Sequence, residues 1–295
     1  MNSDHLGKIE TVSLYGSRRQ EGHIDDIRTL ISGLIAGGKK VYVEKKLADA
    51  INEAGYRLAI HNIKTCTQCP DDTDVAVSVG GDGTFLRTAH WLRGREIPIL
   101  GINTGHLGFL AGNSSDSITR QLEILLTGDA RIEKRLVLGV ECDAIPSSEW
   151  PYALNEVAFF KGAASMIDIK VDADKHYLAS YRADGLIMST PTGSTAYNLS
   201  VGGPIIEPTL KCIVLSPIAP HTLTLRPLVM SGDSRIVAKV ESRAKEFRLS
   251  LDGRAYTVPC GMPVTVKSAP HSVLTVRDAN ENYASTLRSK LLWGS

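Results

Sequence analysis

The sequence lacks any excess of charge of one sign, and it lacks long apolar runs. Lys and Arg number 33 against 32 Asp and Glu, which gives a formal net charge of +1. This balance leaves no basic footprint for nucleic acid. No uncharged apolar run reaches the roughly 18 residues of a membrane-spanning helix, and the polar start, Met1 to His5, lacks a signal peptide's apolar core. We expect a cytoplasmic protein that binds neither membranes nor nucleic acid.

Cysteine is sparse and scattered. The five cysteines stand at positions 66, 69, 142, 212 and 260, an odd count without the regular framework of a disulfide-stapled secreted domain. Cys66 and Cys69 have C-x-x-C spacing, but no second pair and no H-x-x-x-H segment completes a zinc site. Reduced thiols are expected, and the sequence assigns no role to this pair.

Several common catalytic motifs are also missing. The sequence contains no G-x-x-x-x-G-K-[ST], no G-x-G-x-x-G after a strand and no G-x-S-x-G. These absences exclude a Walker-type NTPase, a standard Rossmann dehydrogenase and a hydrolase with a nucleophile elbow. No repeat of fixed period occurs, so a solenoid is excluded as well.

What is present is a chain of 295 residues with one change of pattern, enough for about two domains. Up to about residue 132, apolar strands alternate with amphipathic helices, as expected for an α/β domain with a parallel sheet. From about residue 133 the apolar period becomes two, which favours mostly antiparallel β structure over 133–277. The expected strands are 12–16, 40–43, 75–79, 97–102, 136–140, 166–171, 235–240 and 247–251, and the expected helices are 24–35, 85–92 and 118–126.

The segment Gly80-Gly81-Asp82-Gly83-Thr84 follows a buried strand and precedes a helix. Its glycines allow a tight turn close to a ligand, and the amides at a helix N-terminus attract phosphate. A carboxylate beside phosphates is repelled unless it serves a metal ion or takes a proton from an attacking hydroxyl, and both duties belong to phosphoryl transfer. The plainer alternative is a βα turn with Asp82 as helix N-cap.

A second segment, from Asp184 to Tyr197, gathers Ser and Thr hydroxyls and a phenol around Gly193. Such groups suit a ligand with many hydroxyls and ring edges, as a nucleoside has. The alternative is a Ser/Thr-rich turn that caps a helix. A third element, Asn155-Glu156, interrupts an apolar strand expected from Tyr152 to Phe160, so at least one of the two should face a core or cleft unless the strand ends there.

Together these segments resemble the NAD kinase family. Its GGDGT, NTGxLGF, NE, DG…TPTGSTAY and PHTL…RPLV motifs occur in the same order at 80–84, 103–109, 155–156, 184–197 and 220–229. GGDG turns also occur in lipid kinases and phosphofructokinases, so TPTGSTAY is the discriminating motif. The resemblance implies an N-terminal α/β domain over 1–132, a C-terminal β domain over 133–277, and a tail over 278–295 that returns to the first domain.

The resemblance also implies an activity: transfer of a phosphoryl group from ATP to the adenosine-ribose 2′-hydroxyl of NAD, forming NADP. Asp82 would be the general base that activates this hydroxyl, with Gly83 and Thr84 near the phosphates and ribose. Phe109 would contact the adenine side, Asn155 and Glu156 the adenine or ribose edges, and Asp184 the nicotinamide end. Thr192, Thr195, Ala196, Tyr197 and Ser200 would complete the nucleotide pocket. Asp252 and Arg182 are further candidates for polar contacts, and a solvated surface position is the alternative for Arg182.

Mg²⁺ or another divalent cation should accompany ATP and neutralise its phosphates, and no metal ligand within the protein is assigned. The resemblance favours a homo-oligomer, either a tetramer or a dimer. Polyphosphate as an additional donor, and the choice between NAD and NADH, stay open. The rival readings are a lipid or sugar kinase with the same turn, and a dinucleotide sensor without turnover.

Overall fold

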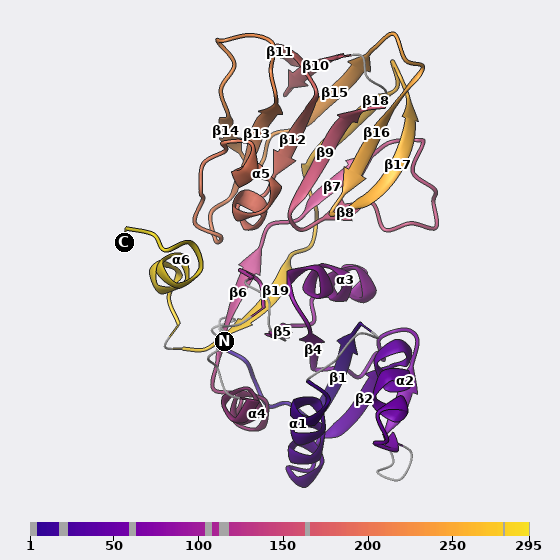
Figure 1. Ribbon diagram of the computed structural model, residues 1–295, viewed down its shortest axis with the longest axis vertical. Coiled ribbons are helices and arrows are strands. Elements are labelled where there is room, and N and C mark those ends of the chain that lie inside the picture. Colours follow the sequence, from indigo (N-terminus) through magenta and orange to yellow (C-terminus); the bar gives the residue numbers. More distant parts are fainter. Residues whose placement is uncertain are drawn as a thin grey trace. The chain divides into compact units, whose positions relative to one another are not determined.

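The computed structural model describes residues 5–17, 23–58, 63–103, 108–111, 118–162, 166–279 and 281–294 (Figure 1). The chain divides into two compact units. The first contains the chain through Lys134 and again from Val273 onward, and the second contains Arg135–Ser272. Within the described ranges, no helix combines the length and apolar character needed to cross a bilayer.

The first unit is built on a seven-stranded sheet of order β3-β2-β1-β4-β5-β19-β6. The pairings of β1 with β2 and β4, of β2 with β3, and of β5 with β4 and β19 are parallel. All five positions of β4 are buried at the centre of the sheet, including Ser78, as its otherwise continuous run of Val and Ala predicts. The strands are β1 (Thr11–Gly16), β2 (Lys40–Glu44), β3 (Lys64–Cys66), β4 (Val75–Val79), β5 (Ile99–Ile102), β6 (Arg131–Arg135) and β19 (Val273–Arg277).

Helices cover both faces of this sheet. The core on one face includes apolar side chains of α1 (Ile24–Ala36), α2 (Lys45–Glu53) and α4 (Ile118–Thr127), whereas α3 (Asp82–Leu92) lies over the other face (Figure 1). Successive strands run outward from β1 to β3 and then cross back to β4 and β5. The order therefore reverses between β1 and β4, and ligands of such sheets bind at the carboxyl ends of the strands beside this reversal.

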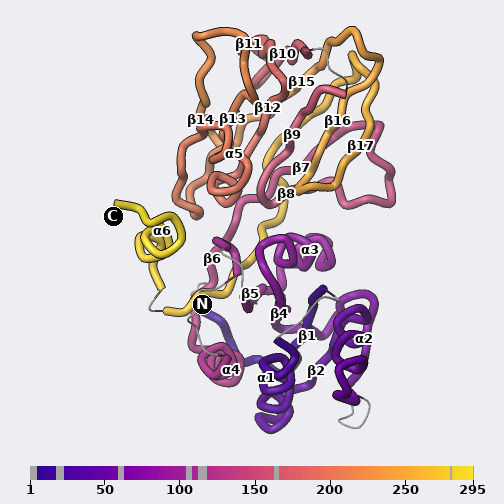
Figure 2. The backbone as a smooth tube through the Cα atoms, viewed as in Figure 1, coloured from indigo at the N-terminus to yellow at the C-terminus, as the bar shows by residue number. Residues whose placement is uncertain are grey.

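The structure corrects the expected boundary between the domains. Residues 133–134 and 273–277 were assigned to the β domain, but they belong to β6 and β19 of the first sheet, where Thr275 pairs with Ile99. Figure 2 traces the chain along β6, through the second unit and back along β19. The helix α6 (Tyr283–Leu291) follows in the first unit. The alternating pattern of Val273–Arg277 matches that of the preceding strands, and a local pattern does not identify a pairing partner.

The second unit consists of two six-stranded antiparallel sheets with a common core. Inward residues such as Ile169 and Val240 of one sheet share this core with Phe159 and Leu249 of the other. One sheet has the order β11-β10-β15-β18-β7-β8 and the other β14-β13-β12-β9-β16-β17. The α/β plus antiparallel fold class predicted from the sequence is thus confirmed. The strands are β7 (Leu138–Glu141), β8 (Tyr152–Ala153), β9 (Glu156–Lys161), β10 (Ile167–Ala173), β11 (His176–Ala183), β12 (Gly185–Ser189), β13 (Cys212–Ile218), β14 (Leu228–Ser231), β15 (Ile236–Glu241), β16 (Glu246–Leu251), β17 (Arg254–Pro259) and β18 (Pro263–Ser268).

Candidate functional site

The glycine-rich turn joins β4 to α3 at the carboxyl end of the sheet. The fold requires glycine at one of its positions but not at another. Gly80 has φ +146°, and a Cβ there would lie 2.5 Å from Thr84 Oγ1, so the fold itself requires glycine. Gly83 is exposed in the first turn of α3, and a Cβ there would meet nothing nearer than Arg87 Nη1 at 3.6 Å. The fold therefore does not require Gly83, whereas close approach of a phosphate to the helix N-terminus would.

Asp82, the first residue of α3, uses its carboxylate to hold a second segment. Its Oδ2 accepts from the Phe109 amide at 2.7 Å, and its Oδ1 accepts from the Leu110 and Ala111 amides at 3.0 and 3.1 Å. A Cβ at Gly108 would lie 2.3 Å from Asp82 Oδ1, which explains the glycine there. A carboxylate has about four lone-pair sites, so three amides leave one for a hydroxyl. Residues 104–107 of the NTGxLGF motif lie outside the described residues.

The turn also has a cation that the sequence analysis did not identify. Arg87 donates from Nη2 to Thr84 Oγ1 at 2.9 Å and lies beside Gly83. Arg87 stands four residues after Gly83, so both lie on the same side of α3, and this spacing was the available signal. Among the described residues Arg87 forms no ion pair with a carboxylate. Its guanidinium is thus available to an anion at the turn.

In the second unit, Asp252 holds Asn155 and Glu156 in place. Its carboxylate accepts the backbone amides of Leu154, Asn155 and Glu156 at 2.6, 2.8 and 3.1 Å. The continuous strand expected from Tyr152 to Phe160 is therefore wrong: β8 ends at Ala153 and β9 begins at Glu156, because these amides bond to a side chain instead of a neighbouring strand. Asp252 occupies the tight turn between β16 and β17, with φ +48°.

The hydroxyl-rich segment packs directly on this bend. A Cβ at Gly193 would lie 2.1 Å from the Asn155 carbonyl oxygen, and Thr190 Oγ1 donates to the Leu154 carbonyl at 2.6 Å. The 3₁₀ turn Thr192–Thr195 and the short helix α5 (Tyr197–Ser200) follow. The structure thus brings Asn155, Glu156, Thr192 and Asp252 together within one unit.

Three buried side-chain atoms of this group have no hydrogen-bond partner among the described residues: Asn155 Oδ1, Glu156 Oε2 and Thr192 Oγ1. Buried polar atoms are almost always paired, and an unpaired one costs free energy. Asn155 Oδ1 can only accept, whereas the Thr192 hydroxyl and a protonated Glu156 carboxyl can both donate and accept. The group therefore suits a ligand that both donates and accepts hydrogen bonds, as ribose hydroxyls and the edge of an adenine ring do.

Glu156 also has a shifted protonation equilibrium. Burial, with a smaller contribution from the Asp252 carboxylate, raises the pKa of Glu156 to about 8. Burial raises the pKa of Asp252 as well, opposed by its three amide donors. At neutral pH the ligand-free group therefore holds Glu156 mainly in its protonated form.

The other predicted site residues lie around or away from this group. Tyr197 is exposed and stacks on Phe160 with ring centroids 5.9 Å apart. Asp184 Oδ1 accepts from Lys161 Nζ at 2.6 Å. Arg182 pairs with Asp168 at 3.1 Å and its side chain is 60% exposed, so its contacts match the solvated alternative. Thr195 and Ala196 are half-buried, and Ser200 is exposed at the end of α5.

Asn198 is a structural residue of this segment that the sequence analysis did not single out. It is fully buried, donates from Nδ2 to the carbonyls of Ser194 and Pro204, and accepts from Ser216 Oγ at 2.6 Å. Ser194 Oγ in turn bonds to the Pro191 carbonyl. Part of the polar content of the motif therefore builds the turn rather than binding a ligand.

In the part of the chain that the structure describes, no group of three or more His, Cys, Asp or Glu side chains could hold a metal ion. Cys66 and Cys69 both lie at the β3 side of the first unit, and burial raises the pKa of the Cys66 thiol to about 12. A protonated thiol is a poor nucleophile and metal ligand.

Two known protein families together match most of the chain. The ATP-NAD kinase N-terminal domain family matches residues 30–130, and the ATP-NAD kinase C-terminal domain family matches residues 154–278. The NAD kinase of Porphyromonas gingivalis is 41% identical over 289 residues, covering 97% of this chain and 99% of the relative. The NAD kinase of Bacteroides fragilis is 44% identical over 225 residues, covering 76% and 78%.

Two solved kinase structures resemble this chain over nearly its whole length. An NAD kinase from Archaeoglobus fulgidus in complex with ATP has a TM-score of 0.72 and 28% identity, covering 95% of this chain and 99% of that one. A yeast NADH kinase complexed with NADH has a TM-score of 0.85 at 23% identity, covering 98% and 89%, and at this identity the likeness concerns the fold.

Proposed function

This chain belongs to the NAD kinase family and is a phosphotransferase, and we propose that Asp82 activates the adenosine-ribose 2′-hydroxyl of NAD for attack on ATP. The supporting observation is the Asp82 carboxylate, which keeps one lone-pair position beside an open helix N-terminus at the carboxyl end of the parallel sheet. The product is NADP, with ADP as leaving group.

The step balances without a covalent enzyme intermediate. The 2′-oxygen forms a bond to the γ-phosphorus as the bond to the bridging β,γ-oxygen breaks, and the hydroxyl proton passes to Asp82. Phosphoryl transfer needs an in-line hydroxyl, a base and charge neutralisation. Arg87, without a described carboxylate partner, and the helix N-terminus at Gly83 would supply the last on the protein side.

We propose that Mg²⁺ arrives with ATP. The fit is through the nucleotide, because the described residues contain no acidic cluster for an ion and the Asp82 carboxylate is mostly occupied by amides. When bound, the ion would neutralise the phosphate oxygens. The chain's own residues orient the hydroxyl and hold the proton.

NAD would be recognised by the group that contains Asn155, Glu156 and Thr192. Ribose hydroxyls and the adenine edge offer both donors and acceptors to the three unpaired buried atoms of this group. The Asp252 carboxylate fixes the backbone beneath them, and the exposed Tyr197 ring offers a face for a second ring system.

The Asp82→Asn variant tests the assignment. NADP formation should fall by about 10² to 10⁴-fold, the usual contribution of a positioned base, with ATP and NAD at saturation. Asp74→Asn is the matched control, because Asp74 Oδ2 also accepts two backbone amides, those of Glu10 and Thr11, both at 2.8 Å, at the opposite end of the sheet. Full activity of folded Asp82→Asn would refute the role of Asp82.

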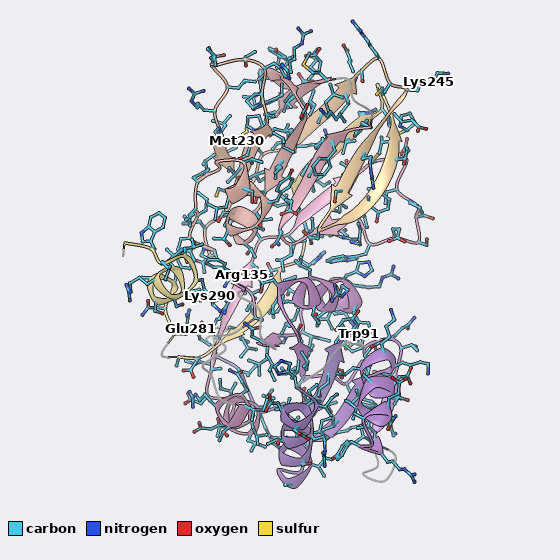
Figure 3. The ribbon with its side chains drawn as sticks, viewed as in Figure 1. Trp91, Arg135, Met230, Lys245, Glu281 and Lys290 are labelled. Carbon is cyan, nitrogen blue, oxygen red and sulfur yellow. The ribbon has the colours of Figure 1, made fainter. Side chains whose placement is uncertain are left out.

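The assembly and compartment are further proposals. A homo-oligomer, dimer or tetramer, is supported by the exposed apolar side chains Leu223, Leu228 and Val229 on and before the edge strand β14, whose Met230 is labelled in Figure 3. Light scattering should give a multiple of 31.9 kDa, and a monomeric mass would contradict it. A cytoplasmic location is supported by the five free cysteines and by the presence of ATP and NAD there.

A further inference from the structure

Arg277, the last residue of β19, has a buried guanidinium directed at the segment that Asp82 holds. Its Nη2 donates to the Phe109 carbonyl oxygen at 2.9 Å, and its side chain is 8% exposed. Its Nε lies 3.8 Å from Glu133 and its Nη1 lies 3.8 Å from Glu281. The bond to Phe109 is thus the short contact, and the two carboxylates balance the charge at longer range.

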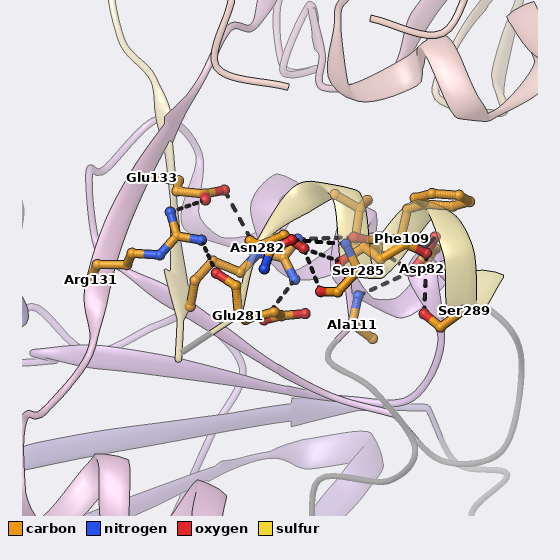
Figure 4. Close-up of polar contacts among 12 residues, drawn as sticks. Asp82, Phe109, Ala111, Arg131, Glu133, Glu281, Asn282, Ser285 and Ser289 are labelled. Carbon is orange, nitrogen blue, oxygen red and sulfur yellow. Dashed lines mark hydrogen bonds and ion pairs between the residues drawn. The ribbon is translucent and has the colours of Figure 1, made fainter. Parts of the chain in front are cut away.

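Charged side chains surround Arg277, and Figure 4 shows three of them, Arg131, Glu133 and Glu281. Arg131 bonds to the Glu133 carboxylate and donates to the Glu281 carbonyl oxygen at 2.8 Å. Two guanidiniums therefore face two carboxylates, all within the first unit. A buried Arg is tolerated only with such partners, and here they also fix the direction of its fork.

One residue connects Arg277 to Asp82. The Phe109 amide donates to Asp82 Oδ2 at 2.7 Å, and the Phe109 carbonyl accepts from Arg277. The amides of Leu110 and Ala111 also donate to Asp82, at its Oδ1. The segment is therefore held from two sides, by a carboxylate in the first turn of α3 and by a guanidinium that stands 168 residues after Phe109 in the chain.

We propose that Arg277 is a positioning residue for phosphoryl transfer. It fixes the Phe109 peptide group, which fixes the orientation of the Asp82 carboxylate and hence of the lone pair that takes the hydroxyl proton. Arg277 itself contacts no substrate. The inference rests on the proposed role of Asp82, and it assigns a catalytic consequence to a strand that lies far from the other motifs in sequence.

The test compares Arg277→Met with Arg120→Met. Arg120 binds the same C-terminal segment through Asp278 at 2.5 Å and also donates to Glu123 at 2.8 Å, whereas the Phe109 carbonyl oxygen accepts from Arg277. Both variants weaken the attachment of this segment, and only Arg277→Met releases the Phe109 carbonyl. The kcat of Arg277→Met should fall about 10- to 100-fold, since small displacements at a reacting group have such effects, with a much smaller change in KM for NAD. Arg120→Met should keep kcat within about twofold of the wild type, below the level at which reacting groups are displaced.

Hydrogen exchange supplies a readout that does not depend on turnover. The amides of Leu110 and Ala111 should exchange faster in Arg277→Met than in the wild type. Their exchange rates in Arg120→Met should equal those of the wild type. Arg277→Lys replaces Arg277→Met as the test variant if the Met variant is too unstable to purify. Lysine keeps the positive charge between Glu133 and Glu281 but lacks the fork that also reaches Phe109, so kcat and protection should still fall.

The outcomes separate this inference from the proposed function. A folded Arg277 variant with unchanged kcat and unchanged exchange at Leu110 and Ala111 would overturn it, as would an equal loss of kcat in Arg120→Met. Activity in the wild type together with inactivity of Asp82→Asn would leave the proposed function intact in either case. An inactive wild type would contradict the proposed function, and the exchange measurement would still report on the Arg277 contact.

Discussion

At the scale of single residues, two aspartates perform the same structural task in the two units. Asp82 accepts the amides of residues 109–111, and Asp252 accepts those of residues 154–156. The sequence directed attention to Asp82, Asn155 and Glu156 through their unusual neighbours. It did not reveal these hydrogen bonds, because the partners lie 27 to 29 and 96 to 98 residues apart in the chain.

Glu156 makes stability depend on pH. The unfolded chain releases this proton near the ordinary value of 4.5, whereas the folded protein keeps it until about pH 8. The folded state therefore binds more protons between these values, and its stabilisation by the neutral form is lost as pH rises toward 8. Each tenfold change in the acid constant is worth about 1.4 kcal/mol.

The Glu156→Gln variant should remove this dependence, because an amide does not ionise in the same range. Its melting temperature relative to the wild type should rise between pH 5 and pH 9, with most of the change complete by about pH 8. Thermal unfolding of both proteins at pH 5, 7 and 9 measures the difference. Parallel melting temperatures across this series would show that Glu156 titrates in its ordinary range.

At the scale of elements, α3 and its preceding turn combine a fold requirement with a ligand requirement. The expected helix began at Phe85, but α3 begins at Asp82, because glycines with low helix propensity obscured the first turn. The buried strand before it was predicted correctly, since a run of Val and Ala broken only by Ser78 is a strong signal. The bend between β8 and β9 was not predicted, because it depends on the distant carboxylate of Asp252.

The Gly83→Ala variant separates the two requirements. A Cβ at Gly83 meets no atom nearer than 3.6 Å, and Ala in a helix is favoured over Gly by up to about 1 kcal/mol. Thermal stability should therefore be equal or higher, while KM for ATP should rise about tenfold, the effect of a misplaced methyl group. Steady-state kinetics and a thermal melt of one preparation give both values.

Gly80→Ala is the companion variant. The added Cβ would lie 2.5 Å from Thr84 Oγ1 at a position with positive φ. The Gly80→Ala protein should therefore melt at a lower temperature than the wild type, unlike Gly83→Ala. A stable Gly83→Ala protein with unchanged KM for ATP would mean that no phosphate approaches this turn closely.

At the scale of the whole molecule, the change of apolar period near residue 133 predicted the two-part architecture, and the first unit does extend to Lys134. The return of the chain at Val273 was missed by a few residues. β19 carries a pattern typical of either sheet, and only its pairing with β5 assigns it to the first. Arg277 gains its contact with Phe109 through this return, so its significance was not readable from local sequence.

The most direct test of the account is NADP formation by the purified wild-type protein. The protein is incubated with ATP, Mg²⁺ and NAD, and the product is detected with an NADP-specific dehydrogenase. We expect NADP to form only when both ATP and NAD are present. No NADP from folded protein at any concentration of either substrate would contradict this expectation.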